Sequence, residues 1–159
     1  MREQPAQPAL HSAQPAAASE TVLAFDFGEK RIGVAVGESL IGNARALATI
    51  AEATSQARFA AIGRLIGHWQ PARLIVGLPN DDTSEHALAA RCRRFANQLH
   101  GRFGLPVALV DERFSSLEAD AALKQLGTGW QDRKALLDAH AAQVILQAYF
   151  QERHGTARG

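Results

Sequence analysis

One stretch near the start of the chain, residues 22–36, constrains the fold more than any other. Two short apolar runs, Val22–Phe25 and Ile32–Val36, enclose a polar turn that contains Gly28. Runs of this length, rich in β-branched and aromatic residues and separated by a glycine-containing turn, are typical of two antiparallel strands. The pattern therefore predicts that the sheet begins with a tight β-hairpin.

Asp26 is the unusual residue of this hairpin, because it ends the first strand between Phe25 and Phe27. A carboxylate in such surroundings needs a cation, a hydrogen-bond donor or water, since burying it unpaired costs free energy. One interpretation is that Asp26 caps its own turn through the amide of Gly28. The other, which we carry forward, is a metal ligand or catalytic carboxylate at a strand end.

Composition bounds the class of protein. The 159 residues suit one domain, and 47% of them are hydrophobic, which is enough for a core. The net charge of +1 neither requires nor excludes a nucleic-acid partner. The single cysteine, Cys92, rules out an internal disulfide, and the histidines lack the paired spacing of a zinc site. No apolar run reaches 18 residues, so we expect no membrane-spanning helix and no membrane partner.

The chain is expected to hold one domain between two tails. Residues 1–20 are dominated by Ala, Pro and Gln, which predicts a disordered tail, and they lack the continuous apolar segment of a secretion signal. The folded domain is expected over 21–152, followed by a flexible tail over 153–159.

After the hairpin, the hydrophobic pattern alternates between strand and helix periods. Thr54 or Ser55 is the expected N-cap of an amphipathic helix that stops before Pro71. Continuous apolar runs later in the chain are typical of strands buried on both faces of a parallel sheet. The predicted later elements are strands over 43–50, 73–79 and 107–110, and helices over about 83–103, 116–126 and from 132 onward.

Three antiparallel strands followed by α/β units imply an α/β fold with a mixed five-stranded sheet and helices on both faces. Ligands of such sheets bind beyond the carboxyl ends of the parallel strands. Asp26 and the pair Asp111–Glu112 stand at such ends. Asp138 heads a core-facing stripe of the last helix that continues through Ala142 and Ile145, so it is the second unusual carboxylate.

Convergent carboxylates without Cys or His ligands favour a hard cation, Mg²⁺ or Mn²⁺. Such a cation suits phosphodiester chemistry, because it activates water and stabilises the leaving oxygen. Lys30, Arg31 and Arg113 flank two of the carboxylates and are candidates for binding phosphate. If the strand order is 3-2-1-4-5, the backbone of Glu112 lies two strands, about 10 Å, from that of Asp26.

Three arginines, Arg91, Arg93 and Arg94, crowd the helix predicted to end near residue 103. Such clusters usually form a solvated face, with the aliphatic part of each side chain covering apolar surface. A phosphate-facing role is the alternative, and the sequence leaves both open.

Four motifs, taken together, resemble the YqgF/RuvX family. They occupy residues 25–36, 75–79, 110–116 and 138–147, in the order of that family. It is a bacterial family of RNase H-like fold, whose members are described as candidate pre-16S rRNA nucleases and earlier as Holliday-junction resolvases. The resemblance covers about residues 21–152, the whole predicted domain.

The resemblance implies functional residues, partners and a location. Its catalytic and metal-binding carboxylates would be Asp26, Glu112 and Asp138, with Glu112 preferred to Asp111. It implies 5′-end maturation of 16S rRNA in ribosome biogenesis, in the cytoplasm, with pre-rRNA and ribosomal particles as partners. The residues assigned to substrate binding are Lys30, Arg31, Arg113 and Ser115.

The chain departs from the family pattern in three places. Glu29 stands where the family usually has Thr or Ser, the loop after Pro79 is shorter, and the Pro-rich tail is additional. The first departure puts an extra negative charge near the site, and none removes a proposed carboxylate.

Other functions stay open. A nuclease that resolves four-way DNA junctions would favour a homodimer over a monomer, and the sequence does not distinguish these states. A non-catalytic RNA-binding assembly factor is also compatible, because a fold does not establish activity. An actin-like ATPase or sugar kinase needs two such domains, and this chain has room for one. A protein kinase is disfavoured, because Asp26-Phe27-Gly28 lacks the accompanying Gly-rich and catalytic-loop motifs.

Overall fold

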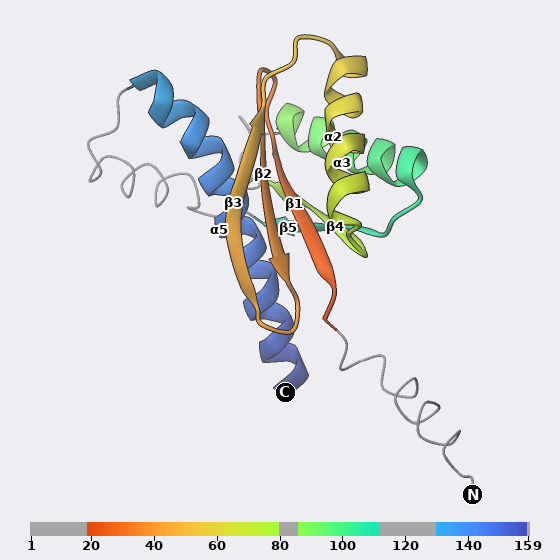
Figure 1. Cartoon of the computed structure of the whole chain (residues 1–159), viewed down its shortest axis with the longest axis vertical. Helices are drawn as coiled ribbons and strands as arrows, with labels where there is room; N and C mark the ends of the chain where they lie inside the picture. Colours follow the sequence, from red (N-terminus) through yellow and green to blue (C-terminus); the bar gives the residue numbers. More distant parts are fainter. Residues whose placement is uncertain (1–18, 80–85, 112–129, 159) are drawn as a thin grey trace, which may run out of the picture.

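The computed structural model describes residues 19–79, 86–111 and 130–158, and side chains over 19–79, 87–111 and 137–153. The strands form one sheet with helices on both sides (Figure 1). In chain order the elements are β1 (Thr21–Phe27), β2 (Ile32–Glu38), β3 (Asn43–Ile50), α2 (Ser55–Trp69), β4 (Arg73–Leu78), α3 (His86–Phe103), β5 (Val107–Asp111) and α5 (Trp130–Arg158).

The sheet is mixed and has the strand order β3-β2-β1-β4-β5. β1 pairs antiparallel with β2, and β2 with β3, whereas β1–β4 and β4–β5 are parallel. The predicted fold class and the order 3-2-1-4-5 are therefore confirmed. Phe27 opposite Ile32 is the last pair of the β1–β2 ladder, so the hairpin loop is residues 28–31.

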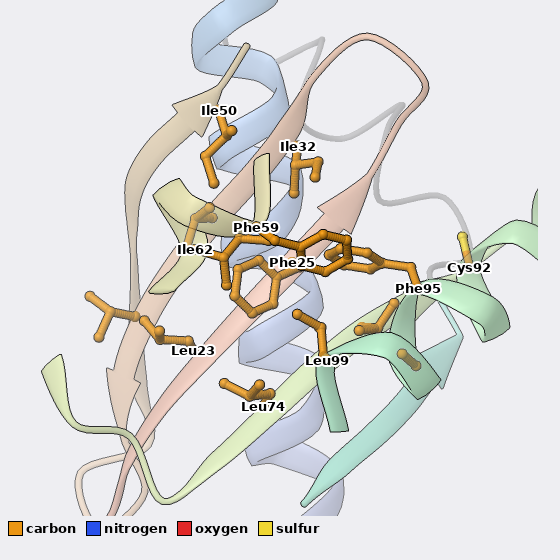
Figure 2. Close-up of a cluster of buried hydrophobic side chains, with 14 residues drawn as sticks. Leu23, Phe25, Ile32, Ile50, Phe59, Ile62, Leu74, Cys92, Phe95 and Leu99 are labelled. Atoms are coloured by element: carbon orange, nitrogen blue, oxygen red, sulfur yellow. The ribbon is translucent and has the colours of Figure 1, made fainter. Parts of the chain in front are cut away.

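Each face of the sheet carries its own hydrophobic cluster. α2 and α3 cover one face, the α2/α3 face, where Phe25, Phe59 and Phe95 come together from β1, α2 and α3 (Figure 2). α5 covers the other, the α5 face, where Ala142, Ile145 and Leu146 pack on alternate residues of β1 and β2. Because strand side chains alternate between faces, the apolar runs of the hairpin supply both clusters.

The helices begin and end for local reasons. The Thr54 hydroxyl accepts a hydrogen bond from the amide of Ala57 at 3.1 Å, which caps α2 as the sequence predicted. α2 stops at Gln70, which adopts a left-handed conformation with φ of 48° and donates its amide hydrogen to Ile66. Cys92 is buried in α3 as a small apolar residue, 1% exposed.

Three expectations concern residues that the structure does not describe. The helix predicted over 116–126 and the turn after Pro79 lie outside the described residues. So does almost all of the predicted N-terminal tail, and β1 begins at Thr21, where the domain was expected to start. At the other end, α5 continues to Arg158, beyond the expected domain boundary at residue 152.

α5 also hydrogen-bonds to the backbone at the start of β3, an edge strand of the sheet. The Gln147 side chain donates to the carbonyl of Gly42 at 2.7 Å and accepts from the amide of Ala44 at 3.2 Å. Gln143 donates to the carbonyl of Ala44 at 3.0 Å. Two side chains of α5 thus satisfy polar groups that an edge strand would otherwise leave to water.

Across the described part of the chain, no helix combines the length and the apolar character that crossing a membrane requires.

Candidate active site

Asp26 lies on the α5 face of the sheet, near the carboxyl end of β1. Val22 and Ala24 belong to the cluster under α5, whereas Leu23 and Phe25 belong to the opposite cluster. Alternation along the strand therefore turns Asp26 toward α5. Its side chain is half-buried.

The backbone of Asp138 is in close contact with β2, the strand next to Asp26. Gly33 is the direct partner of Asp26 in the β1–β2 ladder. A Cβ atom on Gly33 would clash with the carbonyl oxygen of Asp138 and lie 2.9 Å from the amide nitrogen of Ala139. Directly paired residues of antiparallel strands have Cα atoms about 4.5–5.5 Å apart. Asp26 and the backbone of Asp138 are therefore both neighbours of Gly33, Asp26 within the sheet and Asp138 in the helix above it.

Arg31 forms an ion pair with Asp138. The guanidinium Nε donates to the carboxylate Oδ2 at 2.5 Å, and the two side chains are 26% and 21% exposed. Such charge-assisted hydrogen bonds are among the strong ones in proteins. The sequence predicted Arg31 as a phosphate contact, and the structure places it on a candidate catalytic carboxylate. Lys30, the other cation of the loop, is exposed and open to solvent.

The loop is fastened to the neighbouring helices by two arginines. Arg58 of α2 donates to the carbonyls of Gly28, at 3.1 Å, and Glu29. Its Nε also donates to the carbonyl of Glu52 at 3.2 Å. Arg91 of α3 forms an ion pair with the Glu29 carboxylate. Arg91 of α3 therefore neutralises the extra negative charge at Glu29.

Arg58 is a residue that the sequence analysis missed. It lies in the first turns of an amphipathic helix, where a charged residue is ordinarily solvated. No spacing in the sequence links it to a loop thirty residues earlier, because its hydrogen bonds go to backbone carbonyls. Backbone acceptors carry no residue-type signal.

The third predicted carboxylate lies beyond the described residues, as do Arg113 and Ser115. β5 ends at Asp111, which is exposed, and Val110 before it packs in the cluster under α5. Asp111 lines a cavity with Ala148, Gln151 and Glu152 of α5. Within residues 19–79, 86–111 and 130–158, no three His, Cys, Asp or Glu are grouped to hold a metal.

Asp26 and Asp138 offer the type of ligand that a hard divalent cation prefers. They supply oxygen ligands, and they stand on two elements held in contact at Gly33, so little ordering remains to be done. Arg31 beside them is suited to a phosphate oxygen, because a guanidinium has donors to share between two anions.

Comparison with known proteins places the chain in a family. The family model described as "RuvX: Holliday junction resolvase" matches residues 20–152. This chain belongs to the RuvX family. A relative from Methylobacillus flagellatus, named "Putative pre-16S rRNA nuclease", is 57% identical over 86% of this chain and 95% of its own length. A relative of the same name from Chromobacterium violaceum is 55% identical over 85% of this chain and 99% of its own.

A solved structure supports the fold. Thermus thermophilus RuvC, in complex with a Holliday junction substrate, superposes with a TM-score of 0.53 at 17% identity, covering 86% of this chain and 97% of the RuvC chain. At that identity the likeness concerns the fold alone. Together with the strand order, it confirms the RNase H-like fold that the RuvX motifs implied.

Proposed function

We propose that this RuvX family member is a metal-dependent nuclease that hydrolyses phosphodiester bonds at the 5′ end of 16S rRNA precursors. The observation that carries the proposal is the close approach of the Asp138 backbone to Gly33, which is the strand partner of Asp26. The names of the relatives support the choice of substrate. The cytoplasm and nascent ribosomal particles follow as the place of action, because rRNA is matured there.

Each candidate residue would have its own role in metal or substrate binding. Asp26 and Asp138, completed by Glu112, would hold Mg²⁺ or Mn²⁺. That ion, when bound, supplies an activated water and stabilises the leaving oxygen. Arg31 keeps the Asp138 carboxylate oriented and shares its remaining donors with a phosphate oxygen of the substrate. Lys30, exposed on the same loop, would attract the phosphate backbone of the substrate. Arg113 and Ser115 would bind the same nucleic-acid strand.

A second candidate keeps this chemistry and changes the substrate. The family is described as a Holliday junction resolvase, which favours a four-way DNA junction. Junction cleavage needs two paired cuts, so this candidate requires two copies of the chain acting together, whereas rRNA processing is compatible with a monomer.

The test is a cleavage assay with single-residue variants. The purified chain meets a 5′-extended 16S precursor RNA, an unstructured single-stranded RNA and a four-way DNA junction, each with Mg²⁺, Mn²⁺ or EDTA. We expect cleavage of the precursor to need the metal. Asp26→Asn, Glu112→Gln and Asp138→Asn should each slow it by roughly a hundredfold or more, because metal stabilisation of the transition state is worth several kcal/mol.

Asp111→Asn is the matched control, since Asp111 is the adjacent, exposed carboxylate at the end of β5. It should cleave at nearly the wild-type rate. If Asp111→Asn lost activity while Glu112→Gln kept it, the catalytic role would belong to Asp111 instead of Glu112. Preferred cutting of the junction by a dimer would select the second candidate. Binding of precursor RNA without any metal-dependent cutting would reject the nuclease in favour of an assembly factor.

A further inference from the structure

A cavity of about 200 Å³ opens on the α2/α3 face, beside the hairpin loop. Its floor is aromatic, formed by Phe27, Phe59 and Phe95, and its rim is basic, formed by Arg58, Arg91 and Arg94. Neither candidate carboxylate lines it. The cavity is smaller than the pockets that take drug-sized ligands, which suits a single ring system rather than a base pair.

Phe27 offers ring surface to a planar ligand, whereas the Phe59 ring is covered by the Arg102 guanidinium, which lies 4.1 Å from its centroid. The rings of Phe27 and Phe95 have centroids 4.8 Å apart at an angle of 33°, and those of Phe59 and Phe95 are 5.9 Å apart at 32°. Phe59 and Phe95 are almost fully buried, whereas Phe27 at the strand end is half-buried. Nucleobases stack on such side chains, and the gain depends little on which base is bound.

The rim brings three guanidinium groups to one opening. Arg58 is held by the loop carbonyls and Arg91 by Glu29, which fixes both near the mouth of the cavity. Arg94 is exposed, one turn of α3 further along from Arg91. Among the ion pairs of the described residues, Glu29 is the carboxylate that pairs with this group of arginines, and their guanidinium groups can attract phosphate.

The cavity lies next to the candidate active site along one strand end. Phe27 follows Asp26 directly, and consecutive Cα atoms are about 3.8 Å apart. Their side chains point to opposite faces, so the cavity and the carboxylates flank the end of the hairpin, with exposed Lys30 on the loop between them. A nucleic-acid strand that crosses the loop would reach both.

We propose that this cavity is a binding subsite for one unpaired nucleotide of the substrate strand, close to the scissile phosphate. The base stacks on the floor at Phe27, and its phosphate contacts Arg91 and Arg94. This inference rests on the proposed nuclease function for its substrate class. The subsite would make the protein selective for single-stranded sequence. A base that is paired in a duplex is not available to enter the cavity.

The test measures binding in EDTA, so that cleavage does not contribute. Single-stranded RNA 12-mers carry 2-aminopurine at successive positions, and the full chain is titrated in. Arg94→Ala removes a rim charge, and Gln98→Trp fills the mouth from an exposed position of α3. Each should weaken binding about tenfold, the scale of one stacked base, and remove the fluorescence quenching of the position that occupies the cavity.

Arg93→Ala is the matched control. Arg93 is the neighbouring residue with the same charge, but it lines a different cavity with Asn97 and His100. It should change the affinity less than twofold, and Gln98→Trp should leave binding of duplex RNA unchanged. Circular dichroism confirms that each variant is folded.

The outcomes separate the two proposals. Equal weakening by Arg93→Ala and Arg94→Ala, or quenching that persists in Gln98→Trp, would overturn the subsite and leave only general electrostatic attraction. Quenching by AMP alone at similar affinity would reassign the cavity to free mononucleotides. If the variant pattern holds while the chain cuts no substrate, the subsite stands and the nuclease proposal fails. If the chain cuts RNA without this pattern, the reverse is true.

Discussion

Gly33 is the residue on which the geometry of the candidate site depends. It has no side chain where the backbone of α5 crosses β2, so the helix approaches closely enough to bring the backbone of Asp138 against Gly33, the strand partner of Asp26. Gly28 has a related task in the loop, because a Cβ there would lie 2.7 Å from the carbonyl oxygen of Arg31. In both places the missing side chain leaves room for the backbone of a charged residue, Asp138 at Gly33 and Arg31 at Gly28.

A single methyl group at Gly33 should therefore be severely disruptive. We expect Gly33→Ala to lower the free energy of unfolding by about 3 kcal/mol or more, since overpacking against backbone forces the helix away. Urea denaturation measures it. Gly67→Ala is the control, because a Cβ there meets nothing within 4 Å and lies in exposed helix. It should stabilise the protein by about 0.5–1 kcal/mol. Similar stability in both variants would show that α5 is not in contact with Gly33.

At the scale of elements, the hairpin loop acts as a bridge between the two faces of the sheet. Arg31 reaches Asp138 on the α5 face, whereas the loop carbonyls and Glu29 are held by α2 and α3 on the other face. The loop that carries Lys30 is thus restrained from three helices. Such restraint suits a site that must hold phosphate and carboxylates in fixed relation.

Arg58→Lys tests this restraint. An ammonium cannot reproduce the forked donors that a guanidinium directs at several carbonyls. We expect amide hydrogen exchange of residues 28–31 to quicken by about tenfold, with the unfolding free energy changed by less than about 1 kcal/mol because the group is near the surface. Arg64→Lys, an exposed position of the same helix, should change neither. Unchanged exchange in Arg58→Lys would show that the loop is held by other contacts.

At the scale of the whole molecule, α5 joins the end of the described chain to its beginning. It covers the face formed by β1 and β2, and its Gln143 and Gln147 hydrogen-bond to the backbone of Ala44 in the edge strand β3. The same helix carries Asp138 at its amino-terminal part. Stability of the sheet and assembly of the candidate site therefore depend on one packing event.

Gln147→Ala should measure this coupling. It leaves the amide of Ala44, a buried residue, and the carbonyl of Gly42 without their side-chain partners. The expected loss is about 1–3 kcal/mol of unfolding free energy. Gln151→Ala, one turn later and exposed, should stay within about 0.5 kcal/mol. Equal effects of the two substitutions would mean that water replaces Gln147 at no cost.

The described elements and their order could be predicted from the sequence. The hairpin, β3, the capped helix α2 and the parallel strands follow from local hydrophobic period and from turn and cap residues, which act within a few positions. The α5 stripe through Asp138, Ala142 and Ile145 was likewise readable from helical spacing. The functional assignment of Asp26, Glu112 and Asp138 stays a prediction, and Glu112 lies outside the described residues.

Contacts between groups on distant segments could not be predicted from the sequence. Arg31 lies 107 positions before its partner Asp138, and Arg58 bonds backbone carbonyls, so neither contact leaves a periodic signal in the chain. The basic-rimmed cavity likewise combines residues from β1, α2 and α3, each of which looks like ordinary core or solvated surface in its own segment. Local patterns record how a residue behaves within its element, whereas contacts between distant elements depend on close approaches such as that at Gly33.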